Sequence, residues 1–201
     1  MKVLIIGGTR FVGLAITREA IARGHEVSVF HRSETVPPGT ELATHIQGDR
    51  LTDLSRLSGV DWDVVIDVCA YRPTEVDAVA DELGTQISKY VLISTVSVYD
   101  DAIKPHSDED AQLVSTDELS TLDLATVPVM EHYGALKVLC EQSASNRFHE
   151  PLIIRPTYVI GPDDYTNRFT QWVARIGRGG QVNAPEPRSA PLQYIDVRDL
   201  A

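Results

Sequence analysis

Short apolar runs alternate with amphipathic segments along most of the chain, and this alternation predicts an α/β fold. The apolar runs have the length and Val/Ile content of buried strands, and they fall at residues 2–6, 26–31, 44–47, 63–68, 90–95 and 152–155. Helical periodicity occupies intervals between them, at residues 11–23, 73–83 and 129–146. Near-continuous apolar strands separated by helices are typical of a parallel sheet covered on both faces. We therefore expect a doubly wound parallel sheet whose ligand lies beyond the carboxyl ends of the strands.

Beyond residue 160 the pattern changes. Residues 163–177 have the periodicity of another helix, and a Gly- and Pro-containing stretch follows, with Gly177, Gly179, Gly180, Pro185, Pro187 and Pro191. Residues 193–197 resemble a strand, and a further helix is expected to begin within 196–201. Because no turn residue closes that last pattern, we expect residues 161–201 to be the start of an incomplete region.

The charge of the chain argues against nucleic acid as its main partner. The formal net charge is −11, and a negative field repels phosphate backbones. Much of the excess lies between residues 100 and 123, at Asp100, Asp101, Asp108, Glu109, Asp110, Asp117, Glu118 and Asp123. We interpret this run as a solvated surface excursion, with an acidic docking surface as the alternative.

Composition favours a reduced, cytoplasmic setting. No apolar run approaches the roughly 20 residues that span a bilayer, and Met1-Lys2 leads directly into a strand pattern without the features of a signal peptide. The two cysteines, Cys69 and Cys140, lie far apart in the sequence, which argues against a disulfide framework and against a cysteine-rich metal site. The six histidines show no ligand spacing with carboxylates, so we expect no metal centre.

The most informative segment is Gly7-Gly8-Thr9-Arg10-Phe11-Val12-Gly13, which joins the first predicted strand to the first predicted helix. A dinucleotide pyrophosphate needs backbone that it can approach closely and helix N–H groups that point toward the anion. Strand-to-helix turns also use glycine simply to turn, but the strand before and the helix after this one fit the dinucleotide interpretation.

Tyr133 and Lys137 are four residues apart in a predicted helix, so both side chains lie on one face. An ammonium group near a phenol stabilises the phenolate, and it lowers a pKa that is normally about 10 toward the range of a general acid or base. Thr95 ends a predicted strand and Ser97 follows it, so both lie at the carboxyl end, where a hydroxyl can bind a substrate oxygen. Two simpler interpretations stay open: an exposed Tyr133 beside a solvated Lys137, and hydroxyls that only satisfy backbone groups in a turn.

The end of the second predicted strand bears on which dinucleotide binds. NAD-binding chains often carry an acidic residue there, whereas this chain has Arg32, which together with Arg10 suits the 2′-phosphate of NADP. Glu34 is close enough in sequence to keep NAD possible. Asp49, after the third strand, is a candidate acceptor for the adenine amino group, or else the cap of a helix near Thr52.

These motifs, in this order, resemble the extended short-chain dehydrogenase/reductase superfamily, and within it the NAD-dependent epimerase/dehydratase branch with its many reductases. The resemblance rests on the glycine turn, on Thr95 with Tyr133 and Lys137, and on two later landmarks, Arg155-Pro156-Thr157 with Gly161-Pro162 and 194–199. It implies an NAD(P)-binding Rossmann domain at residues 1–160 and a truncated C-terminal substrate region at 161–201.

The resemblance also implies a division of roles. Thr95 would correspond to the catalytic Ser/Thr, Tyr133 to the acid/base, and Lys137 to the residue that holds the nicotinamide ribose and tunes Tyr133. The implied activity is Tyr/Lys-assisted hydride transfer at a hydroxyl or carbonyl carbon of a small molecule, with NADP as cofactor (NAD possible) and a homodimer as a possible assembly. The expected cofactor-binding residues are Gly7, Gly8, Thr9, Arg10, Phe11, Val12, Gly13, Arg32, Asp49, Tyr133, Lys137, Pro156 and Thr157.

One position departs from the family pattern and supports an alternative function. The family turn has glycine at the position of Arg10, and a turn of this kind is similar to a subgroup that includes RNA-binding chloroplast proteins. A non-catalytic NADP-binding sensor, or an RNA-binding relative with the same fold, is therefore the alternative function. Neither the substrate nor the choice between reductase, epimerase and dehydratase follows from the sequence.

Overall fold

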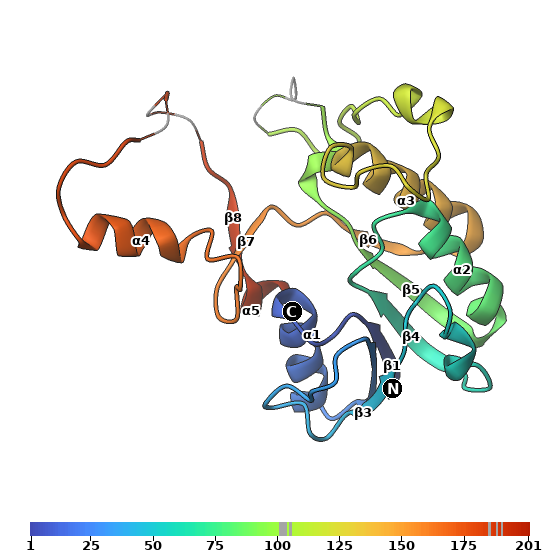
Figure 1. Cartoon of the computed structure of the whole chain (residues 1–201). Helices are drawn as coiled ribbons and strands as arrows, with labels where there is room; N and C mark the ends of the chain where they lie inside the picture. The colour runs from blue at the N-terminus through green and yellow to red at the C-terminus, as the bar shows by residue number, and fades with distance from the viewer. Residues whose placement is uncertain (101–103, 105, 185, 188, 190) are drawn as a thin grey trace.

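A computed structural model of the protein describes residues 1–100, 104, 106–184, 186, 187, 189 and 191–201. Asp101 of the acidic run and Pro185 of the Gly- and Pro-containing stretch lie outside these described residues. Figure 1 shows a central sheet with helices on both faces, and a peripheral arm formed by the C-terminal part of the chain.

The main sheet has six parallel strands in the order β3-β2-β1-β4-β5-β6. The strands are β1 (Lys2–Ile6), β2 (Glu26–His31), β3 (Thr44–Gln47), β4 (Trp62–Asp67), β5 (Ile87–Ile93) and β6 (Leu152–Ile154). The order reverses between β1 and β4, because the chain first winds outward to β3 and then crosses back. A doubly wound sheet leaves a crevice at such a point, outside the carboxyl ends of the strands.

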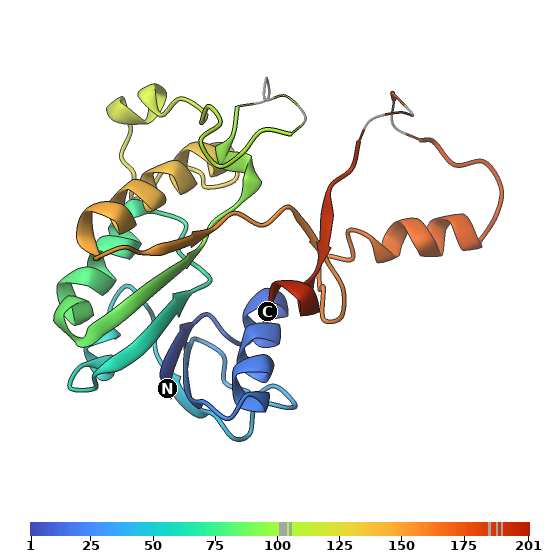
Figure 2. The ribbon, with the colours of Figure 1, turned by 180° about the vertical axis from the view of Figure 1, so that it is seen from behind.

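Alternate residues of the strands build two separate core layers. Leu4, Val65 and Leu92 face one side, where α2 (Pro73–Leu83) and α3 (Tyr133–Arg147) pack on them. Ile5 and Val29 face the other side, which α1 (Phe11–Ala22) covers. Figures 1 and 2, from opposite directions, show α2 and α3 side by side on one face and α1 on the other. Both faces are buried, which explains why the strand sequences are apolar runs rather than alternating patterns.

The remaining elements connect the layers or form the arm. Four short 3-10 helices are η1 (Leu54–Leu57), η2 (Gly84–Gln86), η3 (Val96–Val98) and η4 (Asp117–Thr121). The arm contains β7 (Tyr158–Ile160), α4 (Thr170–Gly177), β8 (Tyr194–Asp196) and α5 (Val197–Leu200), with β7 and β8 paired in parallel. Both ribbon views show α4 projecting away from the main sheet. Trp172, Val173 and Ile176 on α4 are exposed apolar side chains.

The expected doubly wound α/β fold is confirmed, and α2 has the predicted bounds. Two helix predictions were too long: the one for 163–177 begins only at Thr170, and the one for 129–146 begins at Tyr133. Asp163 and Asn167 have φ values of 64° and 52°, and this left-handed backbone interrupts any helix over residues 163–169. Strand β7 was not predicted. In the described part of the chain, no helix is long and apolar enough to cross a membrane.

Candidate active site

A cleft of about 2110 Å³ opens at the carboxyl ends of the strands. Every strand of the main sheet contributes residues that end it or follow it, at positions 6–7, 30–33, 48–51, 68–69, 93–97 and 153–159. The N-terminus of α1 and the first two turns of α3 also contribute to the lining. The cleft therefore lies where a doubly wound sheet binds its ligand.

The glycine turn at the start of the cleft is shaped by close packing. Gly7 has φ of +91°, and a Cβ there would lie 2.8 Å from the Cys69 sulfur. A Cβ on Gly8 would lie 2.5 Å from the Thr17 hydroxyl, and that hydroxyl donates to the carbonyl oxygens of Gly8 and Gly13 at 3.0 and 2.8 Å. The turn is thus drawn tightly onto α1, which leaves its backbone bare toward the cleft. This cradle fits a dinucleotide pyrophosphate.

Arg10 occupies the helix N-cap in an extended conformation, with φ of −139°, so this position does not require glycine. Its guanidinium lies over the ring of Tyr165, 5.8 Å from the centroid. Phe11, the first residue of α1, has φ of 38°, which is unusual for a residue with a side chain. Phe11 packs against Val159 and Val197 of the arm, and this packing holds the strained residue in place.

Arg32 and Asp49 face each other at the far end of the cleft. Their closest side-chain atoms, Nη1 and Oδ2, are 3.9 Å apart, and the Arg32 side chain is 81% exposed. The other carboxylate oxygen of Asp49 accepts a hydrogen bond from the backbone N–H of Leu51 at 2.9 Å. Asp49 therefore closes a local turn and also lines the cleft, but it does not cap a helix as the alternative interpretation expected, since Asp53 is the N-cap of η1.

Thr95 and Tyr133 meet at the opposite end. Burial raises the pKa of the Tyr133 phenol, and both a hydrogen bond with Thr95 and the positive charge of Arg168 act in the other direction without cancelling the rise. The Thr95 hydroxyl also accepts from the Ser97 N–H at 3.1 Å, so the turn interpretation and the site interpretation both describe this residue. At neutral pH, Tyr133 carries its proton.

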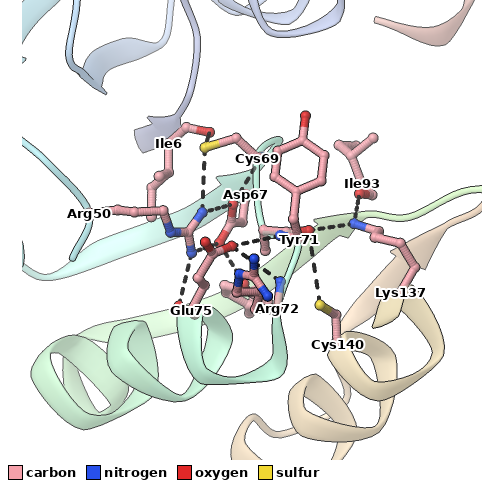
Figure 3. Close-up of polar contacts among 12 residues, drawn as sticks. Ile6, Arg50, Asp67, Cys69, Tyr71, Arg72, Glu75, Ile93, Lys137 and Cys140 are labelled. Carbon is pink, nitrogen blue, oxygen red and sulfur yellow. Dashed lines mark hydrogen bonds and ion pairs between the residues drawn. The ribbon is translucent and has the colours of Figure 1, made fainter. Parts of the chain in front are cut away.

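The expected role of Lys137 in tuning Tyr133 is not seen. The side chain is 2% exposed, and Nζ donates to the carbonyl oxygens of Ala70 and Ile93 at 2.8 Å each (Figure 3). Lys137 thus ties the segment after β4 to the end of β5, while also lining the cleft. Burial lowers the pKa of the Lys137 ammonium, whereas the phenol pKa of Tyr133 is raised. The pair shares a helix face, but the ammonium is directed to backbone oxygens.

A second phenol, Tyr71, faces the same end of the cleft and was missed by the sequence analysis. Its ring centroid lies 6.4 Å from that of Tyr133, and burial raises its pKa to about 12. Figure 3 shows its side chain directed away from α2, and its backbone N–H donates to the Glu75 carboxylate at 2.6 Å. The sequence signal that could have identified Tyr71 is its position shortly after β4. Five of the seven tyrosines line this cleft: Tyr71, Tyr99, Tyr133, Tyr158 and Tyr165.

Behind the glycine turn lies a buried ion pair that the sequence did not reveal. Both terminal nitrogens of Arg50 donate to the Asp67 carboxylate, at 2.9 and 2.8 Å (Figure 3). The Tyr90 hydroxyl and the Cys69 N–H also donate to Asp67, at 3.0 and 3.1 Å. Burial acts to raise the pKa of the Asp67 carboxyl, but the Arg50 charge and these hydrogen bonds prevail and lower it. Burial raises the pKa of the Cys69 thiol to about 11, which makes it a poor nucleophile.

The cleft brings together most of the expected site residues, namely Gly7, Thr9, Arg10, Phe11, Val12, Arg32, Asp49, Thr95, Tyr133, Lys137, Pro156 and Thr157. Gly8 and Gly13 do not line it; they allow the turn and α1 to pack closely. The Thr157 hydroxyl donates to the carbonyl oxygen of Gln193 at 2.6 Å, which links the segment after β6 to the segment before β8. No group of three or more potential metal ligands occurs among the described residues.

Comparison with known proteins adds sequence and fold relationships. No family model matches the chain. It is 30% identical to the chloroplast stem-loop binding protein of 41 kDa b from Arabidopsis thaliana over 219 aligned positions, which include the whole chain and 53% of that protein. The chain therefore spans about half the length of this curated relative.

Solved structures match the chain along its whole length. UDP-N-acetylglucosamine 4-epimerase from Bacillus cereus has a TM-score of 0.70 and 18% identity, with 100% of this chain and 71% of the enzyme covered. The NAD-dependent NDP-hexosamine 5,6-dehydratase TunA has a TM-score of 0.72 and 21% identity, with 99% and 69% covered. The chain has the fold of the extended short-chain dehydrogenases/reductases. MoeE5 has the same fold, with a TM-score of 0.73 and 18% identity, and the match covers 100% of this chain and 69% of MoeE5. Its structure was solved with UDP-glucose and NAD.

Proposed function

We propose that this chain carries the nucleotide-binding part and the proton-transfer residues of an NAD(P)-dependent oxidoreductase, epimerase or dehydratase. The substrate would be a small molecule that reacts at a hydroxyl or carbonyl carbon. One observation carries the proposal: the Thr95 hydroxyl and the Tyr133 phenol lie close enough to interact, in the same cleft that contains the glycine turn.

The residues of the cleft divide between cofactor and substrate. The backbone of residues 7–13 would hold the pyrophosphate, and Arg32 and Asp49 would hold the adenosine end. When bound, the nicotinamide supplies or accepts the hydride. We propose NADP as the preferred cofactor, because the exposed Arg32 guanidinium suits a 2′-phosphate. NAD is the alternative, since relatives of the same fold use it.

Tyr133 would donate its proton to a substrate oxygen, since the raised phenol pKa keeps it protonated at neutral pH. Thr95, which lies beside that phenol, would orient the same oxygen. Lys137 would fix the floor of the site through its bonds to Ala70 and Ile93, and its place in the lining also suits contact with the nicotinamide ribose.

We further propose that residues 1–160 and 161–201 belong to different domains and that the protein is a homodimer.

The test begins with nucleotide binding and then turnover. We expect the purified protein to bind NADP or NAD in a calorimetric titration, and to convert a compound in a panel of nucleotide sugars that includes UDP-glucose. Tyr133→Phe should lower kcat by about 10²- to 10⁴-fold, because it removes the proton donor. Tyr194→Phe, at an exposed phenol outside the cleft lining, is the control. Unchanged turnover in Tyr133→Phe would remove this residue from the mechanism.

RNA binding is the second candidate, and the name of the Arabidopsis relative is the observation that favours it. The net charge of −11 opposes it, since phosphate contacts require positive charge. The discriminating measurement is affinity for a stem-loop RNA over a range of salt concentrations. A steep fall in affinity with salt would support RNA binding, and a flat response or no binding would exclude it. Nucleotide binding without turnover on any compound would favour the sensor.

A further inference from the structure

We propose that Glu141 and Arg155 form a positioning pair that sets the geometry between Thr95 and Tyr133 and fastens Tyr99 and Glu109 to the wall of the cleft. The inference rests on the proposed function of Thr95 and Tyr133. It goes beyond that function because it assigns a task to two charged residues that neither transfer a proton nor follow from the glycine turn.

Glu141 continues the face of α3 that carries the site. Tyr133, Lys137 and Glu141 succeed one another at intervals of four residues, so they lie one above the other along the helix. Glu141 is 4% exposed. Its carboxylate accepts hydrogen bonds from the Ser94 hydroxyl at 2.5 Å and from Arg155 Nη2 and Nε at 2.7 and 3.1 Å. A buried carboxylate with three charged or polar donors is fully engaged.

Ser94 connects the Glu141 carboxylate to Thr95. Ser94 immediately precedes Thr95, which has an extended backbone with φ of −163° and ψ of 152°. Ser94 and Thr95 both line the cleft, and because they are adjacent in the chain, anchoring the Ser94 side chain to α3 restricts the position of Thr95 relative to Tyr133 on the same helix. The Ser94 N–H also donates to the Ile154 carbonyl at 2.7 Å. Glu141 is therefore joined to Tyr133 by two helical turns and to Thr95 by one residue.

Arg155 extends the connection to a second wall. Its Nη1 donates to the Tyr99 hydroxyl and to the carbonyl oxygen of Glu109, both at 2.9 Å. The guanidinium also lies 4.9 Å from the centroid of the Tyr99 ring. The hydrogen bond with Glu141 raises the pKa of Arg155, so its charge persists at all relevant pH values.

The segment held by Arg155 forms part of the cleft. Tyr99 pairs with Leu113 in an isolated antiparallel bridge, and the Val114 N–H donates to the Val98 carbonyl at 2.9 Å. Ser107, Asp108, Glu109 and Asp110 line the cleft beside this bridge. Because Arg155 follows β6 and binds Glu109, it fixes the acidic segment against the sheet at the substrate end.

A contribution to folding stability does not by itself explain why the Glu141 and Arg155 charges are buried together. Replacing a buried ion pair by apolar residues of similar volume is often neutral or stabilising, so the net contribution of the charges to the free energy of folding is small. What the pair provides is a fixed relation between four parts of the structure: α3, the end of β5, the residue after β6, and the part of the cleft wall that contains Tyr99 and Glu109. A shift of about 1 Å between catalytic groups can lower a rate by about 10²-fold.

The experiment compares Glu141→Gln with Arg147→Gln. Arg147 lies on the same helix and pairs with Asp77 and Asp81 of α2, but its ion pairs are more exposed and outside the cleft lining. For the substrate that the unmutated protein converts, Glu141→Gln should lower kcat by about 10²-fold while the Kd for nucleotide changes little. Arg155→Lys keeps the positive charge but loses the forked geometry of the guanidinium, so its kcat should lie between that of Glu141→Gln and that of the unmutated protein. Arg147→Gln should match the unmutated protein.

A second readout does not require turnover. The ionisation of Tyr133 is the difference between the ultraviolet pH titrations of a protein and of its Tyr133→Phe counterpart. Since the hydrogen bond with Thr95 lowers the pKa of Tyr133, losing the alignment should raise that pKa in Glu141→Gln and not in Arg147→Gln. If Glu141→Gln does not fold, Ser94→Ala, which keeps the ion pair and cuts only the tether to β5, should give the same shift.

The outcomes separate the two proposals. A folded Glu141→Gln or Ser94→Ala protein with an unchanged Tyr133 titration and unchanged kcat would overturn the positioning role. If the unmutated protein converts no compound, the proposed function fails, and the titration still decides whether Glu141 sets the alignment of Thr95 and Tyr133.

Discussion

Gly13 packs directly against Gly7: a Cβ built on Gly13 would lie 2.2 Å from the Gly7 carbonyl oxygen. The obstacle is backbone, which cannot rotate away as a side chain can. The distance between α1 and the strand before it is therefore set by the absence of a side chain at this one position, and the shape of the phosphate cradle follows from it.

Gly13→Ala should consequently destabilise the protein by about 1–3 kcal/mol and weaken nucleotide binding, because the turn must move away from α1. Gly84→Ala is the matched control, since a Cβ there meets nothing within 4 Å. Denaturant unfolding and calorimetric titration with NADP or NAD measure the two effects. Equal behaviour of the two variants would show that the turn tolerates displacement.

Lys137→Met tests the bonds from the ammonium to the Ala70 and Ile93 carbonyl oxygens. Removing the donor leaves two buried acceptors without it, so we expect a loss of about 1–3 kcal/mol in the free energy of unfolding. Lys89→Met is the control, because the Lys89 ammonium also donates to a carbonyl oxygen, that of Glu150, but at an exposed site. A loss no larger than that of the control would mean that Lys137 serves the ligand alone.

The Arg50–Asp67 pair should make stability depend on pH in acid. The pKa of Asp67 is lower in the folded protein than its ordinary value of 3.8, so the unfolded chain binds the proton more readily. The stabilisation is complete above that ordinary value and is lost as the pH falls through the folded pKa. Asp67→Asn should cost about 3–5 kcal/mol near neutral pH, because it leaves the Arg50 charge buried and unpaired.

The measurement for this pair is the free energy of unfolding from about pH 7 down to about pH 3. Asp67→Asn should show a smaller decline than the unmutated protein over the acid end of this range. Asp61→Asn, at an exposed aspartate, is the control and should retain the full decline. Parallel curves for all three proteins would contradict the assignment.

Arg32→Ala tests the choice of cofactor. If the Arg32 guanidinium binds the 2′-phosphate, the variant should lose about 10-fold or more in NADP affinity while its NAD affinity stays close to that of the unmutated protein. Arg23→Ala, at an exposed arginine that pairs with Glu19 outside the cleft lining, is the control. Equal affinities of the unmutated protein for NADP and NAD would exclude the proposed preference.

The sequence predicted the features that depend on local pattern. Both faces of the sheet are covered, so each strand appears as an apolar run, and the glycine turn follows the first of these runs directly. The helix at 73–83 was placed correctly because Pro73 begins it and Glu75 caps it through the N–H groups of Tyr71 and Arg72. Such signals lie within a few residues of the structure they specify.

The sequence could not predict the partners that the fold brings in from a distance. Four-residue spacing placed Tyr133 and Lys137 on one helix face, but the direction of the Lys137 ammonium depends on backbone oxygens after β4 and in β5. Arg50 and Asp67 are 17 residues apart; Arg50 follows β3 and Asp67 ends β4, and β2 and β1 lie between these strands in the sheet, so their pairing could not be inferred from the local sequence. The four-residue interval from Lys137 to Glu141 was the one local sign of the Glu141–Arg155 pair.

The distribution of aromatic side chains gives the protein two independent optical probes. Five tyrosines surround the cleft, whereas the described part of the cleft lining contains neither tryptophan: Trp62 is buried in the core and Trp172 is exposed on α4. The ultraviolet difference absorption of these tyrosines should therefore respond when a nucleotide fills the cleft and changes their surroundings. Tryptophan emission should change on unfolding, when the buried Trp62 becomes exposed to solvent.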